Sequence, residues 1–309
     1  MIETISVVIP TYNRASFICR AVESVFYQTF RNFEVIVVDD GSTDNTSQVL
    51  EKFKRLPNFQ YLYQVNRGRS VARNEGSRIT TGDWIMYLDS DDYLEKNALQ
   101  ILYNLAKEAR DSVIVYANFL FFVSGGPAYS HRRPFTGKVL NTNLLFELLE
   151  AKFCLTKTGT YLIQKELTHY TGGFYTAFEP SEDLEYAIRM LPEAKVSYVN
   201  DIVLYVERHA ENTGNKEMQL AIVRICKHYL AKTDEWKQIL SPKEVKRASF
   251  ALKLRIANMS YEMNDHRRSF VYYFSLVRSK PVMLFDKFIF KQLFASMIPW
   301  KLKKVIKKI

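Results

Sequence analysis

The stretch "GDWIMYLDSDD" (82–92) decides the fold class, because an apolar run leads directly into a cluster of carboxylates. Residues 84–88 are apolar and of strand length, and Asp89, Asp91 and Asp92 follow at once. A short apolar run bounded by polar residues is typical of a strand buried on both faces of a sheet. The sequence therefore predicts a buried strand whose carboxyl end carries negative charge, either in a solvated turn or around a cation.

Two earlier apolar runs end in the same way. The run "ISVVI" (5–9) leads into "PTYNR" (10–14), and "FEVIVV" (33–38) leads into "DDGS" (39–42). Helix-like patterns separate these runs, and alternating strands and helices predict an α/β fold: a mostly parallel sheet with helices on both faces. Since ligands bind beyond the carboxyl ends of such strands, the three polar segments are expected to outline one site.

The pattern changes after about residue 124, and from residue 215 nearly all of the chain has helical periodicity. We therefore expect an α/β domain over 1–214 and a basic helical C-terminal extension over 215–309. Residues 1–200 have a formal net charge of −2, whereas residues 201–309 have +12. The basic character thus belongs to the extension.

The last residues mix aromatic and aliphatic side chains with lysines. After Pro299, apolar residues fall on one helical face and lysines on the other, as in a helix that lies on an anionic membrane surface. Packing of this helix against its own domain is the alternative. No nucleic-acid-binding motif is present, so we expect peripheral membrane contact and no nucleic-acid partner.

The sequence also indicates a compartment. No apolar run reaches the ~18–20 residues of a membrane-spanning helix, and the N-terminus has no basic region or cleavage site of a signal peptide. The cysteines, Cys19, Cys154 and Cys226, are odd in number and widely separated, which argues against a disulfide framework and for a reducing environment. We expect a cytoplasmic protein, or one that is peripheral on the inner face of the cytoplasmic membrane.

The acidic turn suits a divalent cation. Carboxylates two positions apart, Asp89 and Asp91, fit Mg²⁺ or Mn²⁺ that completes its shell with phosphate oxygens. The D-x-D spacing alone also fits an Asx turn. Asp40 can accept a hydrogen bond from a base and Tyr12 can stack on one, although a carboxylate after the second strand could instead cap the following helix.

A basic segment follows the third predicted strand. "NRGRSVARNEG" (66–76) contains Arg67, Arg69 and Arg73, which could neutralise a diphosphate. A solvated basic helix face is the alternative for these arginines. Further along, the helical spacing of residues 184–191 puts Asp183 in a first helical turn, where the helix dipole favours an ionised carboxylate.

Taken in order, five motifs resemble those of family 2 of the GT-A glycosyltransferases, which are generally inverting. They are "VVIPTYNR", "QTFRNFEVIVVDDGSTDNT", "GRSVARNEG", "GDWIMYLDSDD" and "GGF…SEDLEYAIRM". The resemblance covers about residues 3–210. It implies the GT-A fold, the Rossmann-like fold of nucleotide-diphospho-sugar transferases, for the domain over 1–214.

The resemblance also implies a role for individual residues. Pro10, Thr11 and Tyr12 would line the nucleoside, Asp40 would contact the base, usually uracil, and Arg73 would lie near the ribose and phosphates. Asp89 would contact the ribose or the metal through water, Asp91 would coordinate Mn²⁺ or Mg²⁺, and His209 would approach the metal or diphosphate. Asp183 would be the general base, with Glu182 as its nearest competitor. The match at His209 is looser than the others.

These residues together predict a metal-dependent, inverting glycosyltransferase of the hexosyl or a related type. Its donor would be a UDP-sugar and its acceptor a carbohydrate or lipid-linked sugar of bacterial surface-polysaccharide assembly. A sugar-nucleotide pyrophosphorylase is one alternative, but it should have a glycine-rich phosphate loop where this chain has "PTYNR". A non-catalytic, membrane-attached nucleotide-sugar-binding protein is the other, and the presence of Asp91 and Asp183 argues against it.

Overall fold

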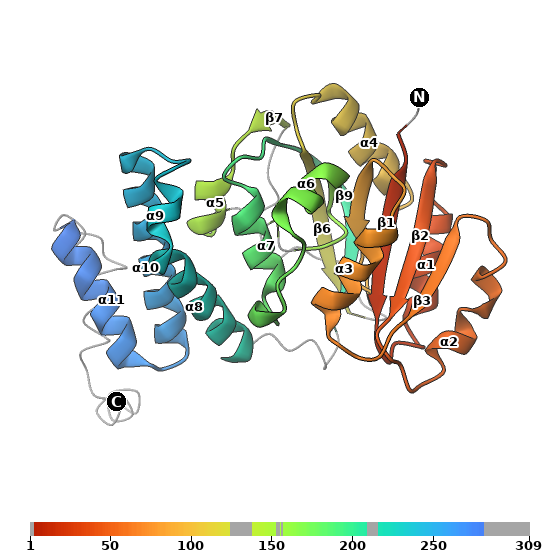
Figure 1. Ribbon diagram of the computed structural model, residues 1–309, viewed down its shortest axis with the longest axis horizontal. Helices are drawn as coiled ribbons and strands as arrows, with labels where there is room; N and C mark the ends of the chain where they lie inside the picture. The colour runs from red at the N-terminus through yellow and green to blue at the C-terminus, as the bar shows by residue number, and fades with distance from the viewer. Residues whose placement is uncertain (1–2, 124–137, 153–154, 156, 209–215, 281–309) are drawn as a thin grey trace. The chain divides into compact units, whose positions relative to one another are not determined.

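The computed structural model describes residues 3–123, 138–152, 155, 157–208 and 216–280 (Figure 1). The chain divides into two compact units. The first comprises residues 1–144, 154–177 and 182–213, and the second comprises residues 145–153, 178–181 and 214–309. The predicted domain boundary after residue 214 stays a prediction.

The first unit is built on one sheet of nine strands within the described residues. The strands are β1 (Ile5–Thr11), β2 (Phe33–Asp39), β3 (Phe59–Tyr63), β4 (Trp84–Tyr87), β5 (Tyr93–Leu94), β6 (Ile114–Phe122), β7 (Val139–Thr142), β8 (Tyr161–Gln164) and β9 (Val196–Glu207). Their order in the sheet is β3-β2-β1-β4-β8-β6-β9-β5, with β7 also paired to β9. The helices of this unit are α1 (Ile18–Phe26), α2 (Thr46–Val49), α3 (Arg69–Ile79), α4 (Ala98–Glu108), α6 (Lys165–Thr171) and α7 (Glu182–Met190), with a 3-10 turn η1 (Glu51–Phe53).

The first four strands of this order are parallel and carry the predicted site. β1 pairs in parallel with both β2 and β4, and β2 with β3. Every residue of β1, β2 and β4 is buried, as their continuous apolar runs predict. Parallel pairing brings the carboxyl ends of these strands to one edge of the sheet, so the segments after them lie near one another.

Helices cover both faces of the parallel strands. Alternate residues of β1, such as Val7 and Ile9, share a hydrophobic core with α1 and α4. On the opposite face, α3 packs closely through Gly76, where an added Cβ would lie 2.4 Å from a methyl group of Val8. The predicted α/β fold with helices on both faces is confirmed by these contacts.

The second half of the sheet is mixed, which the sequence pattern did not reveal. β8 inserts between β4 and β6 and runs antiparallel to both, whereas β6 and β9 are parallel. β5 and β7 both run antiparallel to β9. β8 is four residues long and β5 only two, so they offer little local periodicity from which to predict a strand.

The second unit is helical, as predicted for the C-terminal extension. Its helices are α5 (Leu145–Leu149), α8 (Lys216–Ala231), α9 (Thr233–Trp236), α10 (Pro242–Glu262) and α11 (His266–Ser279). α10 begins with a capping box in which Ser241 and Glu244 satisfy each other's backbone N–H groups, with Pro242 at the first helical position. Ala257, Tyr273 and Leu276 form the core between α10 and α11. Among the described residues, no helix has the length and hydropathy needed to cross a bilayer.

Candidate active site

The nucleoside-binding residues that the sequence predicts lie at the ends of β1 and β2. Thr11 is the register partner of Asp39, so these two strands end together. Pro10 and Thr11 are buried, whereas the Tyr12 side chain is 46% exposed. The buried Oγ1 of Thr11 has no hydrogen-bond partner among the described residues. An orphaned buried hydroxyl is uncommon, and a bound polar ligand would satisfy it.

Asp40 holds the loop that precedes α3. Its carboxylate accepts hydrogen bonds from the backbone N–H groups of Arg67 (2.9 Å) and Gly68 (2.8 Å) and from the Gln64 side-chain amide (2.6 Å). The neighbouring Asp39 accepts from the Ser42 N–H and the Tyr61 hydroxyl. The carboxylates of Asp39 and Asp40 therefore fix the loop after β2 and the loop before α3. The contact of Asp40 with the base stays a prediction.

Arg73 connects the acidic turn to the start of α7. Its side chain is 3% exposed, and it donates to Asp89 Oδ1 at 2.8 Å and to Glu182 Oε1 at 2.7 Å. Its guanidinium also lies 5.1 Å from the centroid of the Phe174 ring. Two carboxylates and an aromatic ring thus surround this cation. These contacts give Arg73 a positioning role between the two carboxylates. Its predicted place near the ribose and phosphates stays a prediction.

The acidic turn itself is half-buried at Asp89, whose side chain is 31% exposed. Burial opposes ionisation of Asp89, but the positive charges of Arg73, Lys157 and Arg69 lower its pKa below the ordinary carboxyl value. Asp89 therefore stays ionised at neutral pH.

The next residues of the turn are tied to α1 and to the end of β9. Arg20 of α1 donates to the backbone carbonyl of Asp91 at 2.6 Å and pairs with Glu207. The Glu207 N–H in turn donates to Asp92 Oδ1 at 3.2 Å. Burial, together with the charges of Asp89 and Asp91, raises the pKa of Asp92 well above its ordinary value. Asp92 therefore has a structural role, and the backbone of Asp91 is held by Arg20.

The two carboxyl groups at the N-terminus of α7 differ in their surroundings. Glu182 is buried and ion-paired with Arg73, whereas Asp183 accepts a hydrogen bond from the Leu184 N–H at 2.7 Å. Burial and the negative charge of Glu182 raise the pKa of Asp183 to about 7. A carboxylate with such a pKa can accept a proton near neutral pH, which suits Asp183 better than Glu182 for general-base chemistry.

The donor set fits a divalent cation that also binds phosphate. Asp89 and Asp91 provide two carboxylates on one turn, and Mg²⁺ is usually held by one or two carboxylates plus substrate phosphates. The described residues contain no cluster of three or more histidine, cysteine or carboxylate side chains that could enclose a metal alone. His209, the predicted further ligand, lies outside the described residues, so its role stays a prediction.

Two cations near this site, Lys157 and Arg20, are not predicted by the sequence. Lys157 acts electrostatically on Asp89, Asp92 and Asp183, and it comes from the irregular segment before β8. Arg20 lies on α1, on the side away from its apolar face. Neither residue belongs to a recognisable motif, so only the fold brings them to the carboxylates.

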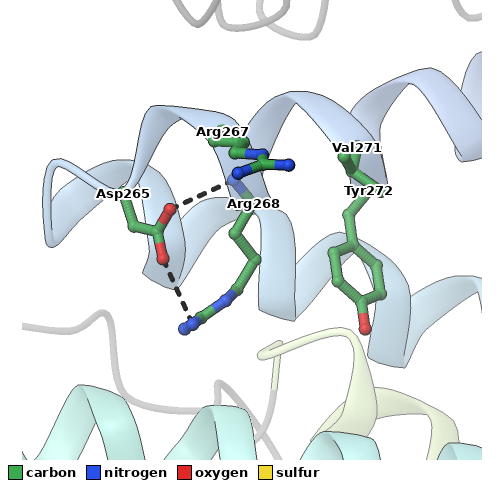
Figure 2. A pocket seen from close by; sticks show the side chains of 5 residues that line it. All are labelled: Asp265, Arg267, Arg268, Val271 and Tyr272. Atoms are coloured by element: carbon green, nitrogen blue, oxygen red, sulfur yellow. Dashed lines mark hydrogen bonds and ion pairs between the residues drawn. The ribbon is translucent and has the colours of Figure 1, made fainter.

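A separate hollow of about 330 Å³ lies along α11 in the second unit (Figure 2). It is lined by Asp265, Arg267, Arg268, Val271 and Tyr272, and Asp265 pairs with Arg268 at 3.3 Å. The hollow is wide open and contains none of the residues that the sequence predicts to be functional. It therefore does not change the assignment of the site.

A family model described as glycosyl transferase family 2 matches residues 6–175, which include the strand ends and the acidic turn. The chain belongs to glycosyl transferase family 2. The predicted resemblance is thereby confirmed.

Curated relatives that the chain resembles are named as glycosyltransferases. Glycosyltransferase GlyG of Streptococcus pneumoniae is 36% identical over 136 residues, which are 40% of this chain and 45% of GlyG. The poly(ribitol-phosphate) beta-N-acetylglucosaminyltransferase TarP of Staphylococcus aureus is 37% identical over 115 residues, or 36% of this chain and 35% of TarP. The matched region thus spans less than half of the length of these relatives.

A solved structure shares the fold. The crystal structure of S. aureus TarS 1-349 in complex with UDP-GlcNAc superposes with a TM-score of 0.69 at 19% sequence identity, over 89% of this chain and 81% of that one. The GT-A fold is confirmed by this likeness.

Proposed function

We propose that this family 2 protein is an inverting glycosyltransferase that moves a sugar from a UDP-sugar to a carbohydrate or lipid-linked acceptor. The observation that carries the proposal is the Arg73 bridge, which joins Asp89 of the acidic turn to Glu182 beside Asp183. It couples a candidate diphosphate site to a candidate base. The relative TarP, an N-acetylglucosaminyltransferase, and the UDP-GlcNAc complex of TarS make UDP-GlcNAc the first donor to test.

In the proposed reaction, Asp183 accepts the proton of the acceptor hydroxyl as that oxygen attacks the anomeric carbon. The bond to the diphosphate breaks in the same displacement, so the configuration inverts without a covalent nucleophile on the protein. Arg73 holds Glu182 away from this role by ion-pairing with it. Asp183 is left as the carboxylate with a pKa near 7.

On the donor side, Asp91 and Asp89 would hold Mg²⁺ or Mn²⁺, and the ends of β1 and β2 would line the nucleoside. The bound cation would neutralise charge on the leaving diphosphate as a Lewis acid. The chain's own contribution is a fixed turn: Arg20 holds the Asp91 backbone and Arg73 orients the Asp89 carboxylate. Pro10, Thr11, Tyr12 and Asp40 would complete the nucleoside site.

The experiment measures UDP release from a panel of UDP-sugars, with Mg²⁺, Mn²⁺ or a chelator, for the wild-type chain and Asp91→Asn. We expect release that needs the metal and falls at least 100-fold in the variant. Glu23→Gln, on the exposed surface of α1, is a matched loss of one carboxylate and should retain wild-type release. Release that persists in the chelator and in Asp91→Asn would contradict the proposal.

We further propose that the protein acts at the inner face of the cytoplasmic membrane, in surface-polysaccharide assembly. The support is the alternation of lysines and apolar residues over 282–309, which lies outside the described residues. Co-sedimentation with vesicles tests this idea. Binding to anionic but not neutral vesicles is expected, and equal recovery with both would contradict it.

A further inference from the structure

The segment before β8 forms a tight turn that is fixed to the sheet. The carbonyl of Lys157 accepts hydrogen bonds from both the backbone N–H and the hydroxyl of Thr160. The carbonyl of Thr160 in turn accepts from the Ala117 N–H of β6 at 2.9 Å. Gly159, inside the turn, has a φ of 87°, in the left-handed region where other residues are strained. The turn over 157–160 is therefore held in one conformation beside β6.

Gly159 also brings this segment against the strand that leads into the acidic turn. An added Cβ would lie 2.8 Å from Leu204 Cδ1 in β9 and 3.2 Å from Leu88 Cδ1. Leu88 directly precedes Asp89, and both leucines are fully buried. Since only a glycine allows so close an approach, the backbone of residues 157–160 is packed against the residue before the first carboxylate of the acidic turn.

The Lys157 side chain is half-buried and its ammonium lies near an aromatic ring. Its Nζ is 6.0 Å from the centroid of the Phe121 ring in β6, within the distance of about 6 Å at which a ring attracts a cation. The guanidinium of Arg208 lies 4.4 Å from the same centroid. One ring thus gathers two cations. Because like charges repel, this arrangement favours negative charge nearby.

Three carboxyl groups of the candidate site interact with the charge of Lys157. Burial has the largest influence on the pKa values of Asp89, Asp92 and Asp183, and the positive charge of Lys157 opposes it in each case. Because charge interactions weaken with distance, the ammonium lies near both the acidic turn and the candidate base. The diphosphate of the proposed donor would lie at the first and the acceptor hydroxyl at the second. Lys157 would thus be near the bond that breaks.

We propose that the Lys157 ammonium donates a hydrogen bond to the diphosphate of the donor as that group leaves. This inference rests on the proposed glycosyltransferase function and assigns a catalytic residue to its leaving group. The acceptor oxygen bonds to the anomeric carbon, the proton of that oxygen passes to Asp183, and the electron pair of the broken bond stays on the diphosphate oxygen. A cation already in place there stabilises the added charge without reorganisation.

Lys157 suits this contact better than Arg73 does. Arg73 is buried, and two of its nitrogens are bonded to the carboxylates of Asp89 and Glu182. Lys157 instead has a flexible four-carbon stem and three rotatable donors. Its ammonium can therefore bond a phosphate oxygen while it stays near the carboxylates of the site.

Binding to the free protein tests the contact without turnover. Titrations followed by intrinsic fluorescence compare UDP with uridine, which lacks the diphosphate, in Mn²⁺ for wild type, Lys157→Met and Lys157→Arg. Lys157→Met should bind UDP about tenfold more weakly and uridine within about twofold of wild type, because a hydrogen bond to a charged group is lost only with UDP. Lys157→Arg keeps a charged donor and should recover part of the UDP affinity. Lys195→Met removes an exposed lysine just before β9 and is the matched control.

Titration with Mn²⁺ alone separates this contact from damage to the site. Removing a positive charge near Asp89 should leave Mn²⁺ binding unchanged or strengthen it. Weaker Mn²⁺ binding in Lys157→Met, or equal losses for UDP and uridine, would show that Lys157 only supports the fold and would overturn the inference. An unchanged UDP affinity would overturn it as well.

Turnover then tests the leaving-group role. In Lys157→Met, kcat for UDP release from a UDP-sugar should fall on the order of 100-fold, the usual effect of removing one preorganised donor. If the wild type releases no UDP from any UDP-sugar, the proposed function fails, and the binding results still decide whether Lys157 contacts the diphosphate. If the wild type releases UDP and Lys157→Met keeps kcat within about threefold of it, the leaving-group role is overturned.

Discussion

Replacing Arg73 by methionine tests the central bridge of the site. The substitution keeps an unbranched stem in place of the arginine's aliphatic part but removes the guanidinium that neutralises Asp89 and Glu182. Glu182 is buried, so its carboxylate would lose the partner at 2.7 Å without gaining water. Removing one partner of a buried ion pair costs about 3–5 kcal/mol, whereas loss of an exposed pair costs about 0–1 kcal/mol.

We therefore expect Arg73→Met to lose about 3–5 kcal/mol of unfolding free energy, most of it from the Glu182 contact. For a unit of this size, each kcal/mol lowers Tm by roughly 2–4 °C, so the transition should fall by about 6–20 °C in calorimetry. Adding Glu182→Gln to Arg73→Met removes the uncompensated charge and should restore a large part of the loss. Arg78→Met, on the exposed end of the same helix, is the matched control and should change Tm little.

The result also distinguishes positioning from phosphate binding. If Arg73 served mainly as a phosphate ligand, Arg73→Met would weaken donor binding and leave Tm within about 2 °C of wild type. Such a result, or a double variant no more stable than Arg73→Met alone, would refute the reasoning from the buried bridge.

Four further predictions concern the rest of the site. Because burial raises the pKa of Asp183 to about 7, ionisation of this carboxyl group opposes folding, and the cost is absent below the ordinary carboxyl pKa and complete above pH 7. Asp183→Asn should therefore be more stable than wild type at pH 8 but not at pH 4 in urea titrations. An equal effect at both pH values would contradict the raised pKa of Asp183. Wild-type turnover should rise with pH through about 7 and nearly vanish in Asp183→Asn at every pH, and a rate that falls over this range would exclude Asp183 as the base. Arg20→Leu should release the turn that carries Asp91 and raise the metal concentration needed for half-maximal UDP release. Arg20→Lys keeps the charge and should recover part of the wild-type metal affinity. An unchanged metal requirement in Arg20→Leu would remove Arg20 from this role. Gly173→Ala should lower Tm by several degrees, because its Cβ would meet Asn74 Oδ1 at 2.5 Å and its φ is 75°, and a wild-type Tm would show that the loop relaxes freely.

The parallel half of the fold could be predicted because its strands carry their own signal. β1 and β2 are continuous apolar runs that end in polar segments, and parallel pairing brings those ends to one edge. The strand β8 carries no such signal. It runs antiparallel between β4 and β6, and its neighbours in the sheet come from residues far away in the chain. Its place depends on tertiary packing rather than on local propensity.

The site was predictable in its residue types but not in its internal contacts. Asp89, Asp91 and Asp183 follow or begin regular elements, so their positions can be read from the pattern. The family resemblance predicts Arg73 near the ribose and phosphates, and a solvated helix face is the alternative. Its partners are 16 and 109 residues away along the chain, and only the folded structure reveals that it is buried between them.

Direct binding of UDP tests the central claim, that the acidic turn holds a cation and a nucleoside diphosphate at the strand ends. Isothermal titration with UDP should be performed in Mn²⁺ and in chelator, for the wild-type chain and for Asp91→Asn. We expect binding that is at least tenfold tighter with Mn²⁺ in the wild type and that loses this dependence in the variant. Equal affinity with and without metal in the wild type, or an unchanged metal effect in Asp91→Asn, would contradict it.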